Sequence, residues 1–128
     1  MQIPYCKDTG VGLIPWSPVA RGALTRPWSE RSSKRAETDK FLESLVHARE
    51  DKIDQEIIKR VEEVAKKNNV SMACIATAWT IKKGVVPIIG LGSKKRIEEA
   101  VENSKFELSD EDAKFLEEVY APKEKQGY

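Results

Sequence analysis

Three consecutive cations, Lys94, Lys95 and Arg96, stand where the sequence predicts the start of a helix. Ser93 can cap that helix, and a turn with two glycines, residues 90–92, comes just before it. Cations at the positive end of a helix dipole cost about 0.3 to 1 kcal/mol each, and a bound anion reverses the sign of that cost. The cluster therefore predicts a phosphate site. Arg96 is its strongest member, because guanidinium groups suit planar, multidentate phosphate contacts.

A solvated helix start explains the same cluster without a ligand. In that interpretation Glu98 and Glu99 neutralise the two lysines, and the helix presents only a polar side to water. The residues of this stretch alone leave both interpretations open.

Two short apolar runs must position this cluster. Residues 85–89 form an almost continuous apolar run before the turn, which predicts a strand buried on both faces, as in a parallel sheet. Residues 11–16 predict a second strand. Pro15 should lie at its end or beside an unpaired neighbour, because proline cannot donate a ladder hydrogen bond. Small residues follow at 17–24, where backbone can approach a ligand closely.

Further helices are predicted around these strands. Residues 54–68 place apolar side chains on one stripe, and residues 72–83 are apolar on nearly every side, so the second of these helices should be buried. Ser71 and Ser109 are the expected caps of this helix and of the last one, which ends before Pro122. Strands separated by helical crossovers predict an α/β fold with a parallel sheet.

Residues 25–51 are polar and predict a long loop with one helical turn near residues 41–46. Loops of this length inside compact domains are usually lids or mobile segments. The only histidine, His47, lies here without a carboxylate partner or metal-ligand spacing, so we expect a surface residue.

The length and composition are typical of one globular domain, and the net charge is too small to create a strong electrostatic field around it. The 128 residues are 34% charged, and a net charge of +1 attracts neither nucleic acid nor an anionic membrane. Cys6 and Cys74 belong to no CxxC or Cys/His cluster, so we expect no metal site and no disulfide. We expect a cytoplasmic protein, because no run approaches the ~20 apolar residues of a membrane span and residues 1–4 lack signal-peptide features.

Two strands are too few for a parallel sheet. Both outer edges of such a ribbon stay unpaired, and its apolar residues lack one wall of their core. Either a partner chain supplies further strands, or the chain is a piece of a larger fold.

Three runs of the sequence match a known family. PYCKDTGVGLIPWSPVARGAL, ACIATAWTIKKGVVPIIGLGSKKRIEEAVEN and LEEVYAP, in this order, resemble the carboxyl-terminal portion of NADP-dependent aldo-keto reductases, nearest the fungal aryl-alcohol dehydrogenase-like branch. The resemblance implies that residues 1–128 are a partial domain, about the last third of a (β/α)₈ TIM barrel with its last two strands and their helices. It also implies NADP as cofactor and a small carbonyl compound or alcohol as substrate of the completed barrel.

The resemblance assigns cofactor contacts to both turns. Trp16 would stack on the nicotinamide ring, although without the family it would be interpreted as a core aromatic. The turn after it would hold the pyrophosphate. Ser93, Lys94 and Arg96 would hold the adenosine 2'-phosphate, and Glu99 would face the adenine amino group. The complete predicted site is Trp16, Ser17, Pro18, Val19, Arg21, Gly22, Gly90, Leu91, Gly92, Ser93, Lys94, Arg96 and Glu99.

The family's catalytic residues belong to earlier strands, and no residue of this chain matches them. The expected function is therefore the NADP(H)-binding half-site of an oxidoreductase that transfers hydride between a nicotinamide and a carbonyl carbon, inactive as this chain alone. The alternative is a non-catalytic truncated homologue or partner that docks onto a longer reductase through its open strand edges. A helix-turn-helix nucleic-acid module is disfavoured, because residues 72–76 are apolar where a recognition helix reads bases.

Overall fold

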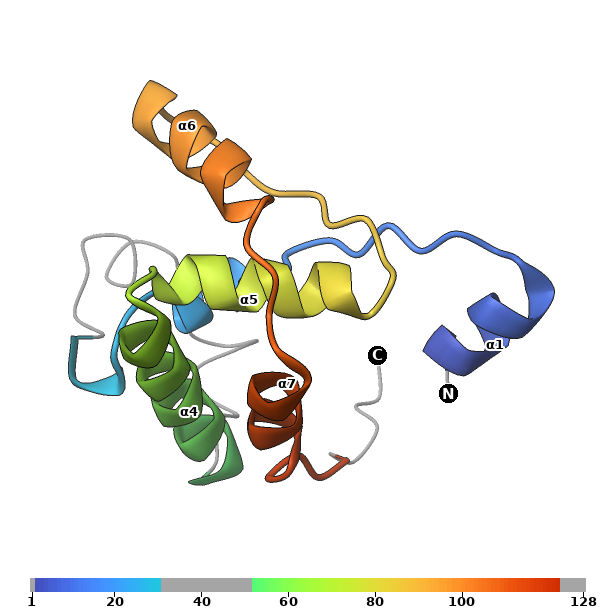
Figure 1. Cartoon of the computed structure of the whole chain (residues 1–128), viewed down its shortest axis with the longest axis horizontal. Coiled ribbons are helices and arrows are strands. Elements are labelled where there is room, and N and C mark those ends of the chain that lie inside the picture. Colours follow the sequence, from blue (N-terminus) through green and yellow to red (C-terminus); the bar gives the residue numbers. More distant parts are fainter. Residues whose placement is uncertain (1, 31–51, 123–128) are drawn as a thin grey trace, which may run out of the picture.

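The computed structural model describes residues 2–30 and 52–122, and most of its elements are helices. They are α1 (Gln2–Thr9), the 3₁₀ helices η1 (Ala20–Thr25) and η2 (Trp28–Glu30), α4 (Lys52–Asn68), α5 (Met72–Lys82), α6 (Lys94–Asn103) and α7 (Asp110–Glu117). Helices α4, α5 and α7 gather into one group, whereas α1 stands apart (Figure 1). The predicted helical turn at 41–46, His47 and most of the predicted lid lie outside the described residues.

Helices α4, α5 and α7 share the hydrophobic core. As predicted, α4 buries one apolar stripe, which includes Val61 and Val64, and α5 is buried on most of its sides. Ile75 on α5 has no exposed surface, and Leu116 on α7 completes the cluster. Full burial of such an aliphatic side chain contributes about 1.5 to 3 kcal/mol, so this core is the main source of stability.

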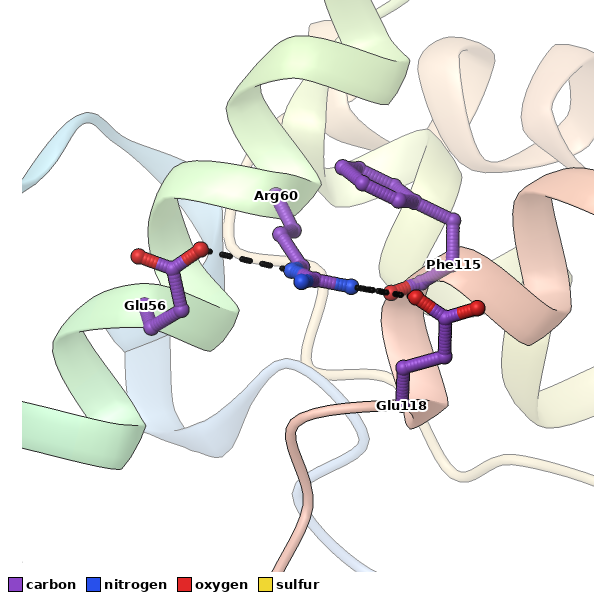
Figure 2. A network of polar contacts seen from close by, with 4 residues as sticks. All are labelled: Glu56, Arg60, Phe115 and Glu118. Carbon is purple, nitrogen blue, oxygen red and sulfur yellow. Dashed lines mark hydrogen bonds and ion pairs between the residues drawn. The ribbon is translucent and has the colours of Figure 1, made fainter.

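Arg60 joins α4 to α7 by polar contacts (Figure 2). Its Nε donates to Glu56 at 3.3 Å, and its Nη1 donates to the Phe115 carbonyl at 2.5 Å and to Glu118 at 3.2 Å. The guanidinium carbon also lies 4.3 Å from the centroid of the Phe115 ring. One half-buried side chain thus fixes the relative position of two helices.

A serine caps three of the helices, as predicted. In each case the hydroxyl accepts the backbone N–H three residues further on, which satisfies a donor that helix geometry leaves unpaired. The pairs are Ser71 with Cys74 at 3.1 Å, Ser93 with Arg96 at 3.4 Å and Ser109 with Asp112 at 3.0 Å.

The two apolar runs lie side by side and parallel, but they pair over too few residues to form a regular two-stranded sheet. Val86 N–H donates to the Leu13 carbonyl at 2.9 Å, and Ile88 N–H donates to the Pro15 carbonyl at 3.0 Å. Trp16 and Ile88 form an isolated parallel bridge. The pairing stays this short because proline lacks an N–H and because no further strand borders either run among the described residues. The assignment to the last two barrel strands stays a prediction.

The predicted burial of the second run on both faces is wrong. Val85 is buried, but Val86 and Ile88 are exposed, as are Ile14 and Trp16 on the neighbouring run. Side chains alternate between faces along extended chain, and the bridge pairs Trp16 with Ile88, so these four exposed side chains share one face. We call it the open face. It is exposed because no second layer from the described residues covers it.

Candidate cofactor-binding site

Both predicted binding turns follow the carboxyl ends of the paired runs. Residues 17–22 come directly after Trp16, and residues 90–92 begin two positions after Ile88. Because the runs are parallel, both turns leave the same end of the pair, and Figure 1 shows the two segments running in the same direction. We call residues 16–22 and 90–99 the carboxyl edge.

Trp16 does not pack in the core, because 71% of its surface is exposed. The guanidinium carbon of Arg21 lies 4.6 Å from the centroid of the Trp16 ring, which is a cation–π contact. An exposed indole at the end of a parallel run offers a flat surface on which a planar ligand can stack.

The turn after Trp16 has an unusual backbone. Ser17, Ala20 and Arg21 have φ values of 57°, 48° and 54°, and Gly22 has 104°. Positive φ outside glycine costs of order 1 to 3 kcal/mol and clusters at binding sites. The Arg21 N–H donates to Ser17 Oγ at 3.0 Å, and this hydrogen bond stabilises the turn. The Arg21 side chain extends from the turn to the Trp16 indole. Sequence reasoning missed Ala20, because nothing in an alanine signals this conformation.

The rest of the carboxyl edge is open to solvent or only half-buried. Pro18 and Val19 are half-buried, whereas Gly90, Leu91 and Gly92 are exposed. A Cβ added to either of these two glycines would meet no atom within 4 Å, so the turn leaves room for a ligand.

The charges at the start of α6 divide into two groups. Lys94 lies 3.8 Å from Glu98 and Lys95 lies 3.7 Å from Glu99, as the solvated helix start requires. Exposed pairs at such distances contribute about 0 to 1 kcal/mol and break easily. The Arg96 guanidinium, in contrast, forms no ion pair with any carboxylate in residues 2–30 or 52–122. Within that part of the chain, Arg96 is therefore the cation of the cluster that is available to an anion.

The opposite end of the second run carries charges that pair with one another. Helix α5 leads into this run, and Lys83 Nζ lies 2.5 Å from a Glu117 carboxylate oxygen that also accepts Trp79 Nε1–H at 2.8 Å. Burial works to raise the pKa of Glu117, but the hydrogen bonds from Lys83 and Trp79 outweigh it and hold that pKa below its usual value. Lys83 and Glu117 help to line a shallow hollow of about 370 Å³. These pairs distinguish this end of the run from the carboxyl edge, where Arg96 has no carboxylate partner among the described residues.

The described residues contain neither a cluster of metal ligands nor a helix that could span a membrane. No group of three or more His, Cys, Asp or Glu side chains there could hold a metal ion, and none of the helices there is both long and apolar enough to cross a membrane. Cys6 and Cys74 are free thiols. Burial raises the pKa of Cys74, which makes this thiol a poor nucleophile.

Parallel runs joined by helices, with both binding turns at their carboxyl ends, are typical of α/β enzymes. A sequence model of the aldo/keto reductase family matches residues 1–121. The chain belongs to the aldo/keto reductase family, whose fold is a (β/α)₈ barrel.

Curated fungal relatives support the same family. Versiconal hemiacetal acetate reductase of Aspergillus parasiticus is 53% identical over 123 residues, which are 95% of this chain and 36% of that protein. A Schizosaccharomyces pombe protein whose name assigns it to the aryl-alcohol dehydrogenases is 48% identical over 127 residues, or 98% of this chain and 35% of that protein. An aldo-keto reductase of Fusarium vanettenii is 44% identical over 127 residues, which cover 99% of this chain and 34% of that protein. The chain thus spans about a third of the length of these relatives.

Proposed function

We propose that residues 1–128 form the carboxyl-terminal part of an NADP(H)-dependent aldo/keto reductase, with the last two barrel strands and half of the cofactor site. The observation that carries this proposal is the parallel bridge between Trp16 and Ile88, because it brings both predicted binding turns to one end of the paired runs. The family match over residues 1–121 supports the enzyme class, which is that of the oxidoreductases.

Each segment of the carboxyl edge has a role in this proposal. Trp16 stacks on the nicotinamide, and the turn 17–22 holds the pyrophosphate through Ser17 and its neighbours. Arg96 binds the 2'-phosphate at the positive end of α6, together with Ser93 and Lys94. Glu99 reaches the adenine amino group after releasing Lys95, from which it lies 3.7 Å away in an exposed and weak pair.

NADPH, when bound, supplies a hydride to the carbonyl carbon of a small aldehyde or ketone. The residues of this chain bind and orient that cofactor, and we propose that the groups that deliver the proton to the carbonyl oxygen lie on the preceding strands of the barrel. The 128-residue chain alone should therefore reduce no carbonyl compound with NADPH, which a spectrophotometric assay of the pure chain checks.

The 2'-phosphate assignment is tested with Arg96→Ala. Loss of a charge-assisted contact of about 1.5 to 3 kcal/mol weakens NADP⁺ binding roughly 10- to 150-fold, while NAD⁺ binding changes little because NAD⁺ lacks this phosphate. The matched control is Lys59→Ala on α4, which removes one exposed cation that is not part of the carboxyl edge. Equal weakening of both cofactors by Arg96→Ala would contradict the assignment.

The open face favours a second candidate function, a chain that docks onto a longer reductase polypeptide. Four exposed apolar side chains on a paired but uncovered face are a binding surface for the other layers of a barrel. We expect the chain to co-elute with the preceding two-thirds of the Aspergillus relative in size-exclusion chromatography, and Ile88→Asp to abolish that association. Separate elution of the unmodified chain and the fragment would exclude docking of this kind.

A further inference from the structure

Arg21 was predicted to lie near the pyrophosphate, yet its guanidinium lies against the indole of Trp16. The 4.6 Å separation from the ring centroid places the charge on one face of the indole. The backbone supports this placement, because Arg21 itself has a φ of 54° and its N–H is bonded to Ser17 Oγ at 3.0 Å. The turn therefore fixes the backbone from which the Arg21 side chain reaches the indole.

One face of the Trp16 ring is covered by this contact, and the rest of the side chain is open. Trp16 keeps 71% of its surface exposed even with Arg21 against it. A flat ligand that leaves this contact intact must stack on the opposite face. The result is a three-layer stack of guanidinium, indole and ligand.

The charge of Arg21 acts through the indole on whatever stacks there. A ring at van der Waals distance on the far face lies roughly 8 Å from the guanidinium carbon. The guanidinium is permanently positive. Repulsion between two unit charges at that distance changes binding by a factor of about 2 in water-like surroundings and about 30 at an effective dielectric constant near 20.

We propose that Arg21 makes the carboxyl edge selective for the reduced cofactor. The nicotinamide ring of NADP⁺ carries a positive charge that Arg21 repels, whereas the dihydronicotinamide of NADPH is neutral and is not repelled. This inference rests on the proposed function, because it requires the nicotinamide to stack on Trp16. Its consequence in a completed barrel is faster release of NADP⁺ after hydride transfer, and hence weaker product inhibition in the direction of carbonyl reduction.

Dissociation constants for NADP⁺ and NADPH test the proposal with the 128-residue chain. Arg21→Gln removes the charge and should lower the ratio of the NADP⁺ to the NADPH dissociation constant by about 2- to 30-fold. Arg21→Lys keeps the charge and should retain most of the ratio, and Lys59→Gln should not move it. Equal weakening of both cofactors by Arg21→Gln, which a phosphate contact predicts, would overturn the proposal.

A second measurement needs no cofactor. Acrylamide quenching of Trp16 fluorescence, taken as the difference between each protein and its Trp16→Phe counterpart, should increase in Arg21→Gln because the covered face becomes accessible. Unchanged quenching would overturn the stacked geometry. If the unmodified chain binds neither cofactor while quenching behaves as expected, the proposed function fails, and the preference for reduced cofactor fails with it.

Discussion

Helices α5 and α6 both begin with a serine cap, but they differ in how much of their surface is buried. A serine caps each of them, Ser71 in α5 and Ser93 in α6. Helix α5 then buries seven of its residues, whereas no residue of α6 is buried. The first helix belongs to the core, and the second carries the cations of the carboxyl edge.

The same contrast separates the two parts of the molecule that contain these helices. Around α4, α5 and α7, apolar burial and paired charges hold the chain without any ligand. At the carboxyl edge the side chains are exposed or half-buried, the ion pairs are long, and three residues other than glycine have positive φ. Under the proposed function, stability and cofactor binding come from different residues, so substitutions should affect one property without the other.

The largest expected effect compares one substitution on the two helices. Ile75→Ala in the core should lower the free energy of unfolding by about 2 to 5 kcal/mol, because it removes buried methyl groups and leaves a cavity. Ile97→Ala on α6, where 49% of the isoleucine is exposed, should cost under about 1 kcal/mol. Urea unfolding followed by circular dichroism measures both. Similar losses would mean that α6 belongs to the cooperative core.

The core was predictable from the sequence because its signals are local. The apolar stripe of α4 and the nearly all-apolar α5 follow from helical periodicity, and the three caps follow from serines at the right spacing. Each of these signals depends on residues within one or two turns of a helix.

Two features, one of the open face and one of the carboxyl edge, were not predictable, because they depend on residues distant in sequence or on backbone conformation. Burial of Val86 and Ile88 requires a second layer, and no composition of the run itself can supply one. The contact of Arg21 with Trp16 is made from a turn with positive φ at Ala20 and Arg21, and neither alanine nor arginine favours that conformation. The parallel placement of the runs, in contrast, was expected from the helical crossovers between them.

An arginine in each region gives the second comparison. Arg60→Ala should lower stability by about 1 to 3 kcal/mol, because it leaves the Phe115 carbonyl and Glu118 without their donor. Arg96→Ala should leave stability within about 0.5 kcal/mol, because Arg96 is exposed. Thermal unfolding of both variants, beside the NADP⁺ titration, separates the two roles. A strongly destabilised Arg96→Ala would place Arg96 in the structural network.

Acid should weaken the core through Asp112. This buried carboxylate accepts hydrogen bonds from Lys67 at 2.7 Å and Asn68 at 3.1 Å, and the bond from Lys67 is the main reason that its pKa lies below the usual value. A lowered folded-state pKa stabilises the fold above about pH 4, the unfolded value, and that contribution is lost as pH falls through the folded-state pKa.

Asp112→Asn removes this dependence and should cost about 1 to 2 kcal/mol at pH 7. Its stability should therefore fall less than that of the unmodified chain between pH 7 and pH 3, as measured by urea unfolding. Parallel curves for the two proteins would assign the acid sensitivity to other carboxylates.

The smallest expected effect comes from removing the serine caps of α5 and α6. Ser71→Ala should cost about 1 kcal/mol of global stability, because α5 cannot unwind at its first turn without disturbing the core that surrounds it. Ser93→Ala breaks a longer bond, 3.4 Å, on a helix that buries nothing, so its cost should appear as local fraying of α6 and not as a shift in the unfolding midpoint. Amide hydrogen exchange resolves the difference. Faster exchange confined to residues 94–103 in Ser93→Ala is expected, and faster exchange throughout α5 as well would mean that the two regions are energetically coupled.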